Sequence, residues 1–226
     1  ADFYDLFGPV DRSLQGDALI LHYKNPLIYD PPSQLTIDAE VAGYVGLDTI
    51  PGAQNIKAGA IHDIASAKLG FTYENTDKSL GALDYEKGVR AQGQVSDDYA
   101  NGQSFPKVWA GLDVGRPLPI KHASIWLYTA VGAAGGGAQN PLTPFYRGAF
   151  GNNYVDYQEV KRYREYDSFP GFKIDELAGQ RFAKSLLELN LPPLRFNEVG
   201  RPSFFLSSMR SALFAGVLAV EPGRRD

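Results

Sequence analysis

The chain of 226 residues contains no cysteine. Without thiols it has no disulfide framework, no Cys-ligated zinc or iron–sulfur site and no cysteine nucleophile. It also lacks a basic excess, because 26 Asp and Glu residues outnumber 22 Lys and Arg residues. A nucleic-acid-binding domain normally carries such an excess. We therefore expect no nucleic-acid partner.

Long apolar runs and catalytic motifs are absent as well. No stretch of roughly 18 apolar residues would make a membrane-spanning helix, and no window keeps a helical apolar period over three turns. We find no Gly-x-Ser-x-Gly, phosphate-loop or His-Glu-x-x-His pattern. The three histidines, His22, His62 and His122, are far apart in the sequence. The sequence therefore predicts no enzyme activity, no cofactor and no metal site.

What the chain does contain is 24 Gly, 13 Tyr and 13 Phe, a composition that favours β-strands joined by tight turns. Period-2 alternation of apolar and polar residues predicts about eight strands. The predicted ranges are 19–29, 35–47, 65–73, 89–95, 108–114, 125–132, 182–191 and, less regularly, 204–219. Several are longer than the usual five or six residues of soluble sheets. We expect an all-β, antiparallel fold.

The two faces of these strands differ in a way that favours lipid outside and water inside. The polar faces carry charges of both signs, as expected of a barrel lumen. The candidate lumen-wall residues are Asp38, Glu40, Lys68, Arg90, Asp113, Lys184 and Glu188. The apolar faces hold small residues that would underfill a close-packed protein core. These small residues are Ala39, Gly43, Ala65, Ala67, Ala91, Gly93 and Ala110.

Aromatic residues near the strand ends suggest girdles at two membrane interfaces. They are Tyr29, Tyr44, Tyr73, Tyr99, Phe105 and Tyr128. We therefore predict an antiparallel transmembrane β-barrel with outer-membrane lipid as its partner. A soluble β-barrel that binds an apolar small molecule stays open as an alternative.

The connection 135–180 is too long for a plain loop in a compact domain. We expect it to lie in the lumen or outside the cell, since short turns at one end and long loops at the other are typical of outer-membrane barrels. Its densest basic cluster is 161–164. Two interpretations are open: contact with lipid phosphate or an acidic lumen wall, or pairing with the neighbouring Glu159, Glu165 and Asp167.

Segments 159–166, 169–172 and 182–193, together with Gly179, resemble the late hairpin of the bacterial surface-antigen barrels, the outer-membrane assembly-factor superfamily. In that family a long loop with an Arg-Gly-aromatic motif folds into the lumen. The resemblance marks Arg162, Arg164 and the loop tip Phe169, Pro170, Gly171 and Phe172 as lumen-loop candidates. Pro170 stands where the family has arginine, so the motif's own cation contact is not implied.

Segments 2–9 and 150–154 are similar to a branch in which the barrel follows a TolB-type propeller. The resemblance implies that 1–226 is one β-barrel region in the bacterial outer membrane, the C-terminal portion of a longer protein. The remaining strands, or a propeller domain, would come from further sequence or another chain. We expect a role in translocation, assembly or anchoring without covalent chemistry. A membrane anchor for a separate propeller or enzyme domain is a further alternative.

Overall fold

A computed structural model describes residues 14–49, 61–137, 140–149, 162–173, 176–201 and 204–221. These residues form β-strands and connections, with a single 3₁₀ turn, η1 (Arg162–Arg164). No helix in these ranges is long and apolar enough to cross a bilayer. The predicted all-β antiparallel fold is confirmed.

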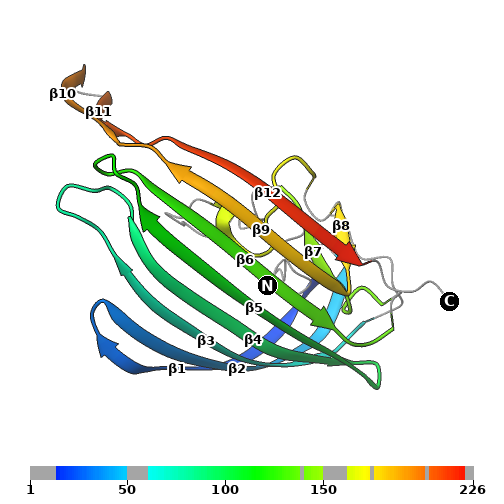
Figure 1. Cartoon of the computed structure of the whole chain (residues 1–226). Helices are drawn as coiled ribbons and strands as arrows, with labels where there is room; N and C mark the ends of the chain where they lie inside the picture. The colour runs from blue at the N-terminus through cyan, green and yellow to red at the C-terminus, as the bar shows by residue number, and fades with distance from the viewer. Residues whose placement is uncertain are drawn as a thin grey trace.

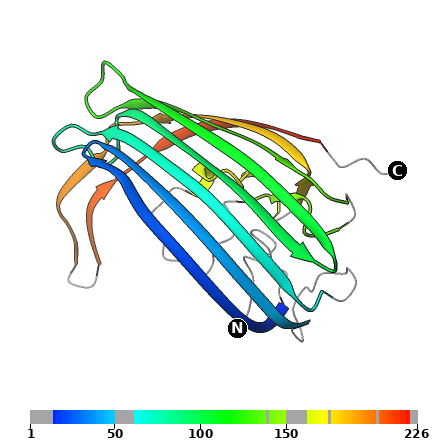
Figure 2. The same cartoon turned by 90° about the horizontal axis from the view of Figure 1, so that it is seen from below.

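Eight long strands form one curved antiparallel sheet with the order β1-β2-β3-β4-β5-β6-β9-β12 (Figures 1 and 2). They are β1 (Leu14–Asp30), β2 (Ser33–Thr49), β3 (Ile64–Asp77), β4 (Lys87–Ala100), β5 (Gln103–Pro117), β6 (Ser124–Ala134), β9 (Arg181–Asn190) and β12 (Ala212–Glu221). Two short pairs of strands complete the described strands. They are β7 (Phe145–Arg147) with β8 (Leu177–Gly179), and β10 (Leu194–Arg201) with β11 (Phe204–Met209).

The single strand predicted over 204–219 is wrong. Pairing breaks at Arg210 and Ser211, so this range contains β11, which pairs with β10, and most of β12, which continues in the same direction within the main sheet. The polar residues Ser207, Ser208, Arg210 and Ser211 interrupt the apolar alternation around this break. The other seven predicted ranges coincide with long strands of the main sheet.

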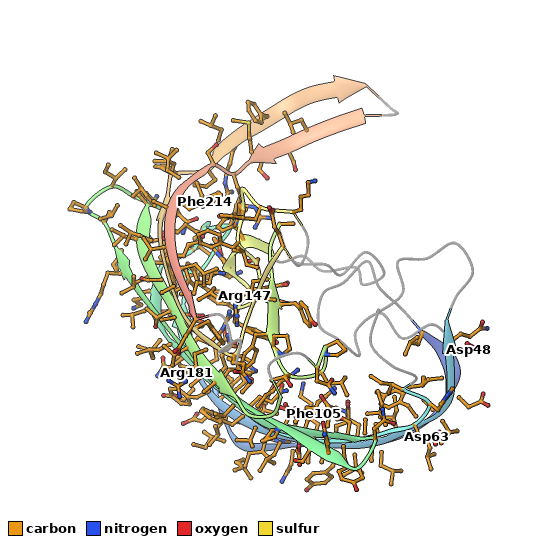
Figure 3. The ribbon with its side chains drawn as sticks, turned by 90° about the vertical axis from the view of Figure 1, so that its right-hand side faces the viewer. Asp48, Asp63, Phe105, Arg147, Arg181 and Phe214 are labelled. Atoms are coloured by element: carbon orange, nitrogen blue, oxygen red, sulfur yellow. The ribbon has the colours of Figure 1, made fainter. Side chains whose placement is uncertain are left out.

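The sheet curves into a trough but does not close on itself (Figure 3). Among the described residues, β1 and β12 each pair with a strand on one side alone. The sequence predicted a barrel whose remaining strands come from further sequence or another chain, and the described residues form an open sheet.

The two ends of the sheet carry different connections. Residues 31–32, 78–86 and 118–123 join strands at one end, here called the turn end, from which the β10–β11 hairpin also projects (Figure 1). The connections 50–63, 101–102 and 135–180 belong to the opposite end, the loop end. The longest connection within the main sheet, 135–180, thus lies at the loop end.

The buried core lies on the concave face, between the sheet and part of segment 140–180. One apolar cluster near the loop end includes Tyr44, Leu47, Phe105 and Leu142. Two further clusters surround Trp126 and Phe182, and loop residues pack against both.

Glycines opposite aromatic residues let rings lie across neighbouring strands. Gly115 pairs with Trp126, and Gly132 pairs with Phe182. A Cβ atom on either glycine would come within 2.2 Å of the partner ring. Real Cβ atoms do not approach so closely, so these two positions require glycine for packing and not for a turn.

Candidate functional site

The convex face of the sheet is apolar and open. Side chains that alternate along the strands and pair in register share this face. Val41 is 60% exposed and Leu69 57% exposed, although both lie near the middle of their strands. Other exposed members of this face are Leu21, Val95, Val108, Leu112, Leu127, Val131, Leu187 and Val217.

Ion pairs mark the two borders of this apolar face. Lys87 and Asp77 pair at 3.0 Å at the turn end, and Arg181 and Glu221 pair at 3.4 Å at the loop end. On β4, the outward charges Lys87 and Asp97 are separated by a charge-free convex surface. Ten residues at ~3.3 Å each span about 33 Å, or about 25 Å along the normal of a barrel whose strands tilt by ~40°. This height equals that of the apolar band of outer-membrane barrels.

The predicted aromatic girdle is wrong for three residues. Tyr44, Phe105 and Tyr128 are buried on the concave side, whereas Tyr29 and Tyr99 are exposed. Strand-end position alone does not reveal which way a ring points. Tyr128 pairs in register with Asp113, a polar-face residue, and this parity places it on the concave face.

Leu47 also departs from the alternation that assigned it to the open apolar face. It is 2% exposed and belongs to the concave cluster. Gly46 has φ +64°, and the β1–β2 register shifts between Gln15 and Asp17. A bulge of this kind inserts one residue and reverses the facing of the next side chain.

Seven candidate wall residues share the concave face, as their cross-strand register requires. Lys68 binds Glu40 at 3.0 Å, and Arg90 binds Glu74 at 3.0 Å. Asp38 lies over Gly70, which leaves room for its carboxylate. The remaining three candidates, Asp113, Lys184 and Glu188, are buried.

Arg164 connects the long loop to the acidic wall. Its Nε donates to Glu188 Oε2 at 2.9 Å, and its Nη2 donates to Glu188 Oε1 at 2.5 Å and to Asp84 Oδ2 at 3.1 Å. Its guanidinium lies 5.3 Å from the centre of the Tyr128 ring. Burial lowers the pKa of Arg164, but its hydrogen bonds to the fully buried Glu188 outweigh that effect and raise the pKa overall. Two forked charge-assisted hydrogen bonds fix both distance and orientation.

Lys184 holds the same loop with the roles exchanged: here the cation belongs to the wall strand β9, and the acceptor oxygens belong to the loop. Its Nζ donates to Ser168 O at 2.6 Å and to Ser168 Oγ at 3.1 Å, and it also contacts the backbone oxygens of Glu165 and Tyr163. A buried ammonium requires such compensation, because it has left water. The lysine therefore orders the turn 163–168 against β9.

Arg147 is a buried cation that sequence reasoning missed. It is fully buried, its Nε donates to Tyr166 O at 3.2 Å, and its guanidinium lies 3.2 Å from the centre of the Phe182 ring. Among the described residues, its Nη1 and Nη2 atoms have no hydrogen-bond partner, and neither does Asp167 Oδ1. Burial lowers the pKa of Arg147 to about 10 and raises that of Asp167. No local sequence pattern around Arg147 indicates that it is buried. Its burial becomes evident only from the residues that surround it in the fold.

Aromatic contacts complete the attachment of the loop. Tyr166 stacks on Trp109 with ring centres 4.1 Å apart, and Tyr163 stacks on Phe214 at 4.2 Å. The paired strands β7 and β8 bring Phe145 edge-on to Phe182 at 5.0 Å. These contacts reach from β5 to β12 across the concave face.

The predicted loop tip forms a turn above β12. The rings of Phe169 and Phe172 lie 5.6 Å apart, and Phe169 forms a bridge with Ala149. Gly171 has φ +103°, a conformation that suits glycine, and Pro170 is half-buried. Phe169 lies beside Gly216, where a Cβ would meet its ring at 3.6 Å.

Some sequence candidates fall outside the described residues. Segments 2–9, 150–154 and 159–161 are among them. Arg162 begins η1, but its side chain lies outside the described part of the structure.

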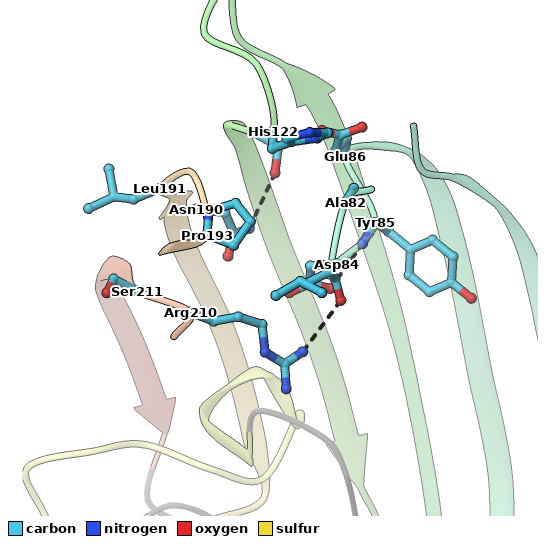
Figure 4. Close-up of a pocket in the computed structure, with 12 residues that line it drawn as sticks. Ala82, Asp84, Tyr85, Glu86, His122, Asn190, Leu191, Pro193, Arg210 and Ser211 are labelled. Atoms are coloured by element: carbon cyan, nitrogen blue, oxygen red, sulfur yellow. Dashed lines mark hydrogen bonds and ion pairs between the residues drawn. The ribbon is translucent and has the colours of Figure 1, made fainter. Parts of the chain in front are cut away.

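A small pocket at the turn end lies between the 78–86 turn, the 118–123 turn and the ends of β9 and β12 (Figure 4). Glu86 contacts His122 Nδ1 at 3.1 Å, and Trp126 Nε1 donates to Tyr85 O at 3.1 Å. Burial raises the pKa of Glu86, but hydrogen bonds from Ser79 and His122 lower it overall. The described residues contain no group of three metal-ligating side chains.

No protein-family model and no curated protein sequence matches the chain.

Proposed function

We propose that the chain forms part of the wall of an outer-membrane β-barrel that acts in translocation, assembly or anchoring without covalent chemistry. One observation carries the proposal: the sheet leaves its apolar face open, while the loop packs on part of its charged face. Soluble proteins bury apolar strand faces, since burial of apolar surface drives folding in water. In a membrane barrel the preference is reversed: the apolar strand faces point outward to lipid, and the polar faces point inward to water or protein.

The size of the open apolar face supports lipid as its neighbour. Apolar patches on soluble monomers rarely exceed a few hundred Å². Here exposed aliphatic residues extend across all eight strands, from Leu21 on β1 to Val217 on β12. The charge-free height of about 25 Å fits a hydrocarbon layer.

The soluble alternative has less support. A soluble barrel that binds an apolar small molecule needs an apolar interior, whereas the concave face carries Glu40, Lys68, Arg90 and Glu74 as ion pairs. Its other half is occupied by the loop that Arg164 and Lys184 hold.

The attached loop indicates how the lumen would work. We propose that 135–180 plugs the lumen, with Arg164 and Lys184 as its two main attachments to β9. Translocation or assembly would then require displacement of the plug, whereas anchoring would leave it in place.

The two edge strands indicate that more strands are required. An unpaired edge exposes backbone N–H and C=O groups, which lipid cannot satisfy. We propose that β1 and β12 pair with strands from further sequence or another chain. A propeller domain, as in the branch that the sequence resembles, would then lie on the same assembly.

The test is membrane dependence. We expect the chain to co-purify with the outer-membrane fraction of a Gram-negative host, to require detergent for extraction, and to migrate faster on a gel when it is not boiled. Monodisperse behaviour in buffer without detergent would overturn the membrane proposal.

A further inference from the structure

Two turns and the start of β10 are locked together at the turn end. Ser79 Oγ lies 3.2 Å from His122 Nδ1, which also contacts Glu86 at 3.1 Å. Arg195 Nη2 donates to Gly81 O. Side chains on these segments are therefore held near one another, although they come from three connections.

This locked surface exposes both cations and large aliphatic residues. Leu80 is 99% exposed and Ile120 is 62% exposed, each next to the Ser79–His122 contact. Lys78 and Lys121 flank the same contact and are exposed, and within the described part of the chain neither has an ion pair. We call these four residues the turn-end rim.

Neighbouring acids do not neutralise the turn-end rim. Glu86 faces His122, and Asp84 is bound by Arg164. Asp77 pairs with Lys87. At the loop end several carboxylates are exposed: Asp17, Asp48, Asp63 and Asp97.

The turn-end rim is continuous with the open apolar face. Arg116 lies two residues beyond Val114 on the convex side of β5 and is exposed. The 118–123 turn follows directly. Cations and aliphatic side chains at the border of an apolar band are the chemistry that binds a lipid headgroup layer, because the aliphatic groups reach the acyl boundary and the cations meet phosphate.

We infer that the turn-end rim binds the phosphate groups of anionic phospholipids in the adjacent leaflet, with Leu80 and Ile120 inserted at the headgroup boundary. The inference rests on the proposed membrane location. It adds an orientation: the turn end lies on the phospholipid side, and its turns 31–32, 78–86 and 118–123 agree with the short periplasmic turns of outer-membrane barrels.

The experiment uses the full chain in micelles of an uncharged detergent, titrated with phosphatidylglycerol. Native mass spectrometry counts bound lipid, and thermal unfolding reports the stabilisation that a bound ligand gives. Lys78→Gln/Lys121→Gln should weaken binding about 25-fold, since each cation near an anionic surface contributes about fivefold. Leu80→Ser/Ile120→Ser should also weaken it and tests the inserted groups separately.

Controls distinguish this rim from general electrostatics. Lys173→Gln/Arg181→Gln removes two exposed cations elsewhere and should leave the affinity unchanged. The inference would be overturned if both double variants lost affinity for phosphatidylglycerol equally, or if Lys78→Gln/Lys121→Gln lost none. Equal protection by lipid A in place of phosphatidylglycerol would overturn the leaflet assignment. The same samples are tested for folding in uncharged micelles, for which slower gel migration after boiling is the sign. Failure of the barrel proposal is therefore distinguishable from failure of the lipid-binding inference.

Discussion

Val41 and Glu40 are adjacent residues of β2 on opposite faces, and they offer the sharpest residue-scale test. Val41 is 60% exposed, and Glu40 pairs with Lys68 at 3.0 Å. If Val41 meets the lipid midplane, Val41→Arg should lower the free energy of unfolding by about 2–4 kcal/mol. Glu40→Gln should cost less than about 1 kcal/mol, because the ion pair is partly exposed.

Denaturant unfolding in lipid vesicles measures both variants, with tryptophan fluorescence as the signal. In water, an arginine at so exposed a position would cost no more than about 0.5 kcal/mol. A larger loss for Glu40→Gln than for Val41→Arg would mean that the two faces are assigned the wrong way round.

Glu188 provides a second residue-scale prediction. Because it is fully buried and binds Arg164 through two hydrogen bonds, Glu188→Gln should cost about 3 kcal/mol. Glu74→Gln, at a half-exposed pair with Arg90, is the matched control and should cost less than about 1 kcal/mol. The same unfolding assay reads both variants, and equal costs would contradict a buried attachment of the loop.

At the residue scale, sequence alternation identifies which charges share the concave face but not which ones pair. Arg164 and Glu188 are both recognisable candidates, yet they are 24 positions apart and meet only because the loop folds back over β9. Arg147 has no sequence signal, since its burial depends on Phe182 and Tyr166.

At the element scale, Lys184 is one of the two main side chains that hold the loop against β9. Lys184→Met removes hydrogen bonds to the backbone of the 163–168 turn while keeping most of the side-chain volume. We expect protease cleavage within 162–173 to become at least several-fold faster. Lys68→Met, on the wall away from the loop, should leave the cleavage rate unchanged, and similar rates in both variants would refute the attachment by Lys184.

The pairing of strands β6 and β9 gives a further prediction. Gly132→Ala would place a Cβ 2.2 Å from the Phe182 ring, and such overpacking costs about 1–3 kcal/mol. Gly43→Ala is the control, since nothing lies within 4 Å of the added atom. Unfolding free energies of the two variants should therefore differ, and equal values would contradict the glycine–aromatic packing.

Strand prediction succeeds where alternation is long and fails where it is interrupted. Seven long strands follow from the period-2 pattern, but the break at Arg210 and Ser211 and the strand β10 do not. Short strands such as β7 exist only because they pair with a distant segment, here β8. No local period specifies such a pair.

At the scale of the whole molecule, the proposed membrane location follows from the two faces of the sheet: the convex face is apolar and open, and the concave face is charged. Alternation shows that each strand has one apolar face, but it cannot tell core from lipid. In the structure the loop packs on the charged face and leaves the apolar face open, and this arrangement supports the proposal that the apolar face meets lipid. The curvature of the sheet and its two edge strands then fit a section of barrel wall.

The absence of cysteine makes the most direct measurement straightforward. Single cysteines at Val41, Leu69, Leu127 and Leu187 on the convex face, and at Glu40, Lys68 and Gln92 on the concave face, can each carry a spin label in the folded chain in lipid vesicles. We predict that the convex labels collide preferentially with oxygen and the concave labels do not. Convex labels that collide preferentially with a water-soluble nickel chelate would contradict the account, because the apolar face would then meet water.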